Sequence, residues 1–146
     1  MLLALFALVS HAGEAPEFCL GKNVHPSLSI YLSSPEKKFP YLKAAEENGL
    51  SLFTEKKPRI RAADLDRVTL QEETNSLLLE MNSSGKKKLE KATRQATGKY
   101  LTFSLKEKNL VSARIASTMV DGKAVLALGG GENSRAITVF LELCER

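Results

Sequence analysis

The chain has 146 residues, of which 43% are apolar and 26% are charged, and its formal net charge is +4. This composition is typical of one ordinary globular domain and excludes collagen-like, disordered and multi-span membrane proteins. Basic and acidic residues alternate through most of the chain, so the modest positive charge gives little support to a nucleic-acid partner, and we expect none.

Residues 1–12 have the pattern of a signal peptide. A largely apolar run from Leu2 to Ser10 is too short to cross a bilayer as a helix, and Ser10 and Ala12 supply the small residues that precede a cleavage site. The run lacks a flanking Lys or Arg, and the alternative is a buried N-terminal strand or helix. We expect cleavage after Ala12, a periplasmic or secreted protein, and no transmembrane span in the mature chain.

The chain has two cysteines, Cys19 and Cys144, which lie near its opposite ends. In an oxidising compartment such residues pair, and the termini of a compact domain often lie close together. We therefore predict a Cys19–Cys144 disulfide. The alternative is two separate thiols, one of them buried.

Residues 13–49 are predicted to form a leader and an irregular region. Within them, Ser27 to Leu32 alternates polar and apolar residues and predicts a short strand. Tyr41 to Asn48 predicts a brief helix, which Gly49 would close.

Residues 50–146 are predicted to form the principal domain, because the hydrophobic period there switches between two and 3.6. Ala62 to Leu65 predicts a helical turn. Leu77 to Met81 is nearly continuously apolar and is expected at the centre of a sheet. The expected strands are Leu50–Thr54, Val68–Leu70, Leu77–Met81, Tyr100–Leu105, Leu110–Ala116 and Lys123–Leu128.

Two helices are predicted in this domain. Residues 82–84 offer caps for the first, which Gly98 would end, and either Asn133 or Ser134 would cap the second. The buried face of the first is expected to hold Leu89, Ala92, Thr93 and Ala96, and that of the second Ala136, Ile137, Phe140, Leu141 and Leu143. The element order predicts an α+β fold, a mainly antiparallel sheet with two principal helices on one face.

No catalytic, metal or cofactor site is expected. After loss of residues 1–12, His25 is the one remaining histidine, which is too few for a two-histidine zinc site. A Cys–His nucleophile pair is formally possible, but a bridge is the better use of the cysteines. Gly129–Gly131 could hold a phosphate before a helix, but the run lacks the spacing of a phosphate-binding loop, and a flexible turn is the preferred interpretation.

Lys86, Lys87 and Lys88 form a basic run near the start of the first predicted helix. The helix dipole disfavours cations there, which points to an anionic partner or membrane surface. The alternative, which is the preferred interpretation of the run, is a solvated face on which Glu90 pairs with Arg94.

Several short segments resemble the head subdomain of the first periplasmic region of SecD, an accessory subunit of the bacterial preprotein translocase. The resemblance begins near Leu52 and ends near Gly130. In two places the chain departs from the family pattern: Lys106–Asn109 replaces an Asp-Gly hairpin, and Ser112–Arg114 replaces a Ser-Ala-Pro. The family's transmembrane helices and base subdomain have no counterpart. The matching segments include Leu77–Asn82, Ser84–Leu89, Ala92–Thr93, Thr97–Leu101, Val111–Ala113 and Gly122–Ala124.

The resemblance implies an exported, non-enzymatic binding module that contacts unfolded or translocating polypeptide, or components of the Sec translocase. Tyr100, Thr102 and Ser104 share one face of a strand that we expect near a sheet edge, where an extended peptide could add as another strand. Together with Lys86–Lys88 they are the candidate binding residues. The alternative is a secreted small hydrolase or an enzyme inhibitor.

Overall fold

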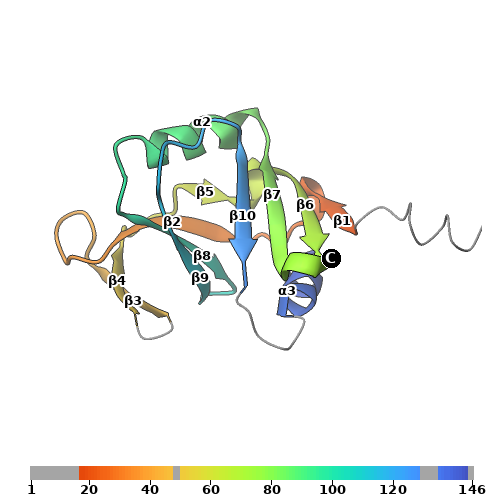
Figure 1. Cartoon of the computed structure of the whole chain (residues 1–146), viewed down its shortest axis with the longest axis horizontal. Helices are drawn as coiled ribbons and strands as arrows, with labels where there is room; N and C mark the ends of the chain where they lie inside the picture. The colour runs from red at the N-terminus through yellow and green to blue at the C-terminus, as the bar shows by residue number, and fades with distance from the viewer. Residues whose placement is uncertain (1–16, 48–49, 129–134, 145–146) are drawn as a thin grey trace, which may run out of the picture.

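The structure is a computed structural model that describes residues 17–47, 50–128 and 135–144. These residues form two antiparallel sheets and two α-helices, which confirms the α+β class (Figure 1). Sheet A has the strand order β1-β6-β7-β10, and sheet B has the order β3-β4-β2-β8-β9, with β5 paired to β2. The strands that the sequence assigned to one sheet are therefore divided between two.

Sheet A has β7 as an interior strand, as its apolar sequence predicted. Leu77 and Leu79 are fully buried, because β7 lies between β6 and β10 and faces the core. Three 3-10 turns, η1 (Gly21–Asn23), η2 (Ala62–Asp64) and η3 (Glu72–Thr74), connect the strands, and η2 matches the helical turn predicted there. The strands of sheet A are β1 (Phe18–Leu20), β6 (Leu65–Gln71), β7 (Ser76–Met81) and β10 (Lys123–Ala127).

Sheet B has β2 at its centre. One side of β2 pairs with β8, and the other pairs with β5 at its start and with β4 at its end. The helix expected over Tyr41 to Asn48 is wrong: Lys43 to Glu47 is a strand that pairs with β4, so strand pairing overrides a locally helix-prone composition. The strands are β2 (Ser29–Ser34), β3 (Lys43–Glu47), β4 (Leu50–Thr54), β5 (Ile60–Arg61), β8 (Tyr100–Leu105) and β9 (Lys108–Arg114).

The N-terminal region is a structural part of both sheets. Residues 13–49 were expected to be a leader, yet β1 pairs with β6 in sheet A and β2 lies inside sheet B. Val24, Leu28 and Ile30 belong to the same buried core as the later strands. A boundary at residue 50 thus does not separate two units of the fold. The predicted signal peptide, residues 1–12, lies outside the described residues.

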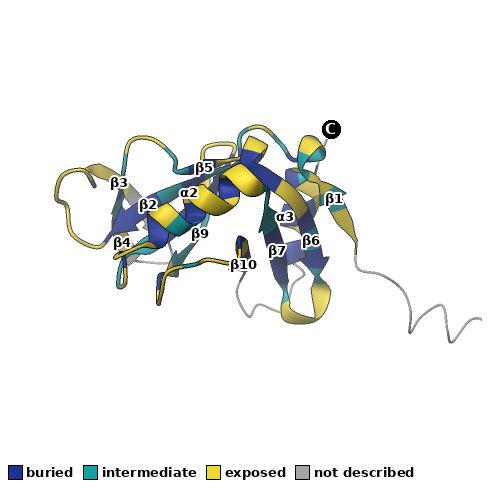
Figure 2. Ribbon diagram, turned by 90° about the horizontal axis from the view of Figure 1, so that it is seen from above, coloured by how far each residue is buried: buried dark blue, intermediate teal, exposed yellow. Residues whose placement is uncertain are grey.

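Helix α2 (Ser83–Thr93) begins where the sequence predicted. The Asn82 side chain accepts a hydrogen bond from the Gly85 amide at 2.9 Å, and Leu89 and Thr93 are fully buried. Figure 2 shows that buried and exposed residues alternate along α2. The helix ends at Thr93, before Gly98, because Arg94 has an extended backbone (φ −66°, ψ 127°) and Gln95 has a φ of 57°. The buried Thr93 hydroxyl donates to the Leu89 carbonyl and accepts from the Met119 amide. Gly98, with a φ of +92°, lies instead in the turn that leads into β8.

Helix α3 (Arg135–Leu143) closes the fold against sheet A. Its buried residues are Ala136, Val139, Phe140 and Leu143, whereas Leu141, which was expected to face inward, is 64% exposed. The spacing of 3.6 residues per turn gives the inward position to Val139 instead. Residues 129–134, including the candidate phosphate loop Gly129–Gly131, lie outside the described residues.

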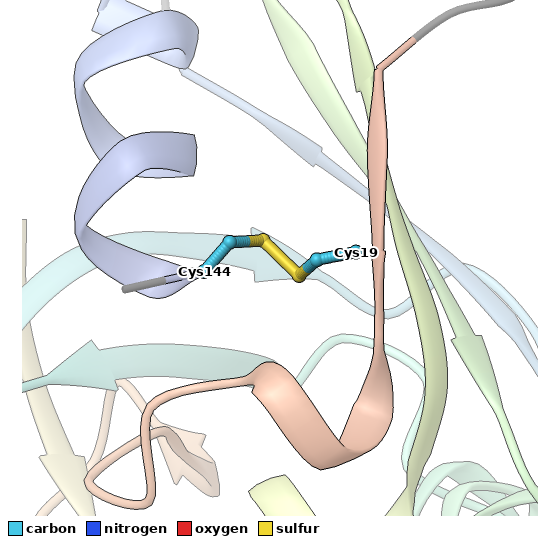
Figure 3. The surroundings of a disulfide bond; sticks show 2 residues. All are labelled: Cys19 and Cys144. Atoms are coloured by element: carbon cyan, nitrogen blue, oxygen red, sulfur yellow. A yellow bond between two sulfur atoms is a disulfide. The ribbon is translucent and has the colours of Figure 1, made fainter. Parts of the chain in front are cut away.

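The predicted disulfide between Cys19 and Cys144 is confirmed. It joins the edge strand β1 to the residue after α3, with 6.0 Å between the two Cα atoms (Figure 3). The bridge spans 125 residues of sequence and therefore ties together the two ends of the described chain.

Candidate functional site

Sheet B curls, so that its two end strands approach each other. Cα atoms of β3 and β9 come within 8 Å, although four other strand pairings separate them in the sheet order. Because side chains alternate along a strand, the face opposite the core lines the inside of this curl. Ser33 and Thr102 are fully buried on that face, while Phe103 and Leu101 of the same strand β8 join the core.

A chain of hydroxyl groups lies inside the curl. The Thr102 hydroxyl lies 2.7 Å from the Ser33 hydroxyl and 2.8 Å from that of Ser112, which links β2, β8 and β9. Each buried oxygen in this chain has a hydrogen-bond partner, so Thr102 contributes to the stability of sheet B. Thr102, a candidate binding residue, is thus enclosed and part of this network.

A polar groove opens at the rim of the curl, between β3 and the β8–β9 hairpin. Its volume is about 450 Å³. The hairpin turn holds Lys106 and Glu107 at φ values of 53° and 66°, the two-residue geometry that matches strand twist. The side chains that line this polar groove include Tyr31, Lys43, Thr54, Ser104, Glu107 and Asn109.

An apolar groove of about 300 Å³ lies between β9 of sheet B and β10 of sheet A. Figure 1 shows β10 between β7 and the β8–β9 hairpin, where the neighbouring edges of the two sheets face each other. The groove gives access to the core between the sheets. Its lining includes Leu101, Phe103, Ala113, Met119, Ala124 and Val125.

Strand β10 presents an open edge to this apolar groove. The Met81 amide donates to the Gly122 carbonyl, and the Leu128 amide donates to the Asn75 carbonyl. Because such bonds alternate along an antiparallel strand, the amides of Lys123, Val125 and Ala127 point away from β7. In the strand order of the described residues, β10 ends sheet A.

The predicted lysine run has three different environments. The Lys86 side chain passes over Gly122, where an added Cβ would lie 3.1 Å from the Lys86 Cγ, and Lys87 is exposed. The Lys88 ammonium lies 2.9 Å from a carboxylate oxygen of Asp64, a buried residue. The solvated pair that the alternative interpretation predicted is also present, since Arg94 lies 3.1 Å from Glu90.

The two sets of candidate binding residues do not form one site. Helix α2 packs against η2, β5 and β7 on the core side, whereas Thr102 and Ser104 point to the opposite face of sheet B. The expectation that Tyr100 to Leu105 lies near an edge is wrong, because β8 is flanked by β2 and β9. The apolar residues Leu101 and Phe103 are paired with both β2 and β9.

The open edge at β10 was missed as a site. The sequence signal was present in the alternation over Lys123 to Ala127, which leaves Val125 54% exposed beside buried Ala124 and Leu126. Sequence could not supply the position of β10 in the sheet: among the described residues, the sheet order leaves β10 unpaired on one side.

Neither cysteine can act as a nucleophile in this structure, because both are joined in the disulfide. The His25 Nδ1 accepts a hydrogen bond from the Ser27 amide and lies 2.8 Å from the Ser27 hydroxyl. These two contacts hold the His25 ring within a local turn. Among the described residues, His, Cys, Asp and Glu form no cluster suited to a metal ion.

Two side chains near β4 have raised pKa values. Burial raises the pKa of the Tyr41 phenol, the Glu55 carboxylate adds to the effect, and Arg59 opposes it. A two-point hydrogen bond to Glu55, at 2.6 and 2.9 Å, raises the pKa of Arg59. These residues form a structural ion pair beside the β4–β5 connection.

Comparison with solved structures finds the same arrangement in SecDF. A chain from the structure of SecDF, a membrane component that enhances protein export, superimposes with a TM-score of 0.57 and 19% identity, over 85% of this chain and 64% of that one. This chain has a SecDF-like fold. The super-membrane-facing form of SecDF gives a TM-score of 0.55 and 18% identity, over 80% of this chain and 18% of that one.

At this identity the likeness to SecDF concerns the fold, and the chain spans less than two thirds of either SecDF chain. No protein-family model matches the chain, and no curated protein matches it. None of the described helices is long and apolar enough to cross a membrane.

Proposed function

We propose that this chain is an exported, non-enzymatic module of the periplasm that binds unfolded or translocating polypeptide through the open edge of β10. The SecDF-like fold supports a role near protein export, because SecDF enhances that process. The disulfide fits an oxidising compartment such as the periplasm. Components of the Sec translocase are the partners that this likeness suggests.

The observation that carries the proposal is the combination of an unpaired strand edge with an apolar groove beside it. An extended guest segment would pair with the outward amides of Val125 and Ala127 through its own main chain, since the Lys123 amide already donates to the Asp121 carboxylate at 3.1 Å. Alternate guest side chains would then enter the apolar groove beside Met119 and Phe103. Main-chain pairing needs no particular sequence, so this binding would be promiscuous.

The lysine run adds a charge preference to the same edge. Lys86 lies over Gly122, the residue that precedes β10, and Lys87 is exposed on the next position of α2. Acidic residues at one end of a bound segment would therefore be attracted. Because the lysines are solvent-exposed, this contribution would weaken as salt rises through physiological strength, where the screening length is about 8 Å.

The test is a titration of ¹⁵N-labelled protein with a carboxymethylated, permanently unfolded polypeptide. We expect amide shifts at β10 and along the apolar groove. Val125→Pro removes an outward-pointing amide at an edge position, where proline is tolerated, and should abolish these shifts. Val125→Thr keeps both the amide and the β-branched shape and is the matched control that should retain them.

If Val125→Pro fails to fold, Met119→Lys places a charge in the apolar groove and serves as the second variant. The proposal is refuted if no resonance moves at high micromolar polypeptide, or if both Val125 variants bind like the unaltered protein. Turnover of a peptide or ester substrate by the purified protein would refute the non-enzymatic part and favour the hydrolase alternative.

A further inference from the structure

The polar groove at the rim of sheet B contains a buried hydroxyl, that of Ser104, which has no hydrogen-bond partner among the described residues. Ser104 is 6% exposed and lines the groove, and within the described chain its side chain makes no hydrogen bond. A buried hydroxyl without a partner costs about 1–3 kcal/mol. Thr102, on the same face of β8, has hydrogen-bond partners in Ser33 and Ser112. The hydroxyl that lacks a partner is therefore the one at the groove, Ser104.

The other groups around Ser104 are neutral or balanced in charge. Asn109 provides an amide, Tyr31 a phenol, and Thr54 a hydroxyl whose bond to the Lys43 carbonyl is long, at 3.5 Å. Two further groups, Lys43 and Glu107, carry opposite charges, and the Lys43 ammonium lies 5.9 Å from the centre of the Tyr31 ring. These side chains offer both donors and acceptors on one concave surface.

This chemistry selects among ligand classes. A phosphate or other anion would meet Glu107, and an apolar ligand would leave the hydroxyls and the amide without partners. A polyhydroxylated ligand matches the set, because each of its hydroxyls both donates and accepts. The volume of about 450 Å³ lies within the range of about 300–1,000 Å³ that is typical of small-molecule sites.

The polar groove differs from the β10 edge in its chemistry. Hydroxyl, amide and charged side chains line the polar groove, whereas the lining of the groove beside β10 is mainly apolar.

We propose that the polar groove is a second binding site, independent of the β10 edge, that takes a neutral saccharide unit. Ser104 and Asn109 bond its hydroxyls, and the Tyr31 ring and the Lys43 side chain form one wall. The site is open at the rim of the curl, so a terminal sugar of a larger glycan can enter it.

The test uses ¹⁵N-labelled protein titrated separately with N-acetylglucosamine and with methyl glucoside at millimolar concentration. We expect saturable shifts at Tyr31, Lys43, Ser104 and Asn109, and none at β10. Ser104→Ala should weaken the affinity about fivefold, the effect of one hydrogen bond, without lowering protein stability. Ser51→Ala, which removes an exposed hydroxyl of β4, is the matched control and should leave the affinity unchanged.

Tyr31→Phe provides a second variant that keeps the ring, and it should also weaken the sugar response. The proposal is overturned if neither sugar shifts the groove resonances at high millimolar concentration, or if Ser104→Ala and Ser51→Ala respond alike. It is also overturned if the carboxymethylated polypeptide, and not the sugars, shifts these resonances. Failure of polypeptide binding at β10 has no bearing on these outcomes, since the two grooves are read through different amides.

Discussion

Loss of the Cys19–Cys144 bridge should remove much of the stability of this fold. The bond closes a loop of 125 residues, for which chain-entropy arguments give about 5 kcal/mol, acting mainly on the unfolded state. A domain of this size is typically stable by about 5–15 kcal/mol. The double variant Cys19→Ser, Cys144→Ser is therefore expected to be far less stable than the oxidised protein, although it keeps the same fold.

The native contacts around the bridge explain why the fold should survive its loss. Helix α3 still buries Val139, Phe140 and Leu143, and β1 still pairs with β6. Urea unfolding followed by circular dichroism measures the difference, with reductant added to both proteins as the control. Reductant should bring the unaltered protein to the level of the double variant and leave the variant unchanged. A double variant within about 1 kcal/mol of the oxidised protein would refute this reasoning.

Three further changes test the packing of α2 and the environment of β4. Lys88→Ala should lower the free energy of unfolding by about 1 kcal/mol, because it leaves the buried Asp64 carboxylate without its ion-pair partner, while Lys87→Ala should change it by less than about 0.5 kcal/mol. Gly85→Ala should destabilise by about 1–3 kcal/mol in chemical denaturation, since its Cβ would overlap the backbone oxygen of Asp64 and stand 2.9 Å from the Asp64 Cβ. A gain in stability, as helix propensity alone predicts, would show that these contacts relax. The folded state holds the Tyr41 proton more tightly than the unfolded state, so the contribution of Tyr41 to stability should be constant below about pH 10 and fall as pH rises through its folded pKa. Tyr41→Phe should flatten that alkaline part of the pH profile, and an unchanged slope would contradict the assigned cause.

Elements with a strong local pattern were predictable from sequence. The Asn82 cap and the buried spacing of Leu89 and Thr93 define α2 without reference to the rest of the fold. The apolar run of β7 likewise indicated an interior strand. In both cases one local pattern agrees with the tertiary environment.

Elements that depend on distant partners were not predictable in the same way. Lys43 to Glu47 has helix-forming composition but becomes a strand because β4 provides its hydrogen bonds. The polar face of β8 looks solvent-facing in sequence, yet the curl of sheet B buries Thr102 against Ser33 and Ser112. Sheet order, which decides where the open edges lie, is a property of the whole chain.

The candidate sites follow the same division. The sequence analysis placed Ser104 on a binding face because it expected β8 near a sheet edge. The structure shows that β8 is not an edge strand. Ser104 nevertheless lines a groove. The lysine run was visible at once, but the nearness of Lys86 to the start of β10 required the packing of α2 across the two sheets. No local pattern carries that information.

Hydrogen exchange at β10 tests the central claim most directly. The amides of Val125 and Ala127 point away from β7 and should exchange rapidly in the free protein, whereas those of Ala124 and Leu126 are bonded within sheet A. When a carboxymethylated, unfolded polypeptide is present at saturation, strand addition predicts that the two outward amides become protected while Ala124 and Leu126 change little. Polypeptide binding that leaves these two amides exchanging at their free rate would contradict the proposal that the open edge of β10 is the binding site.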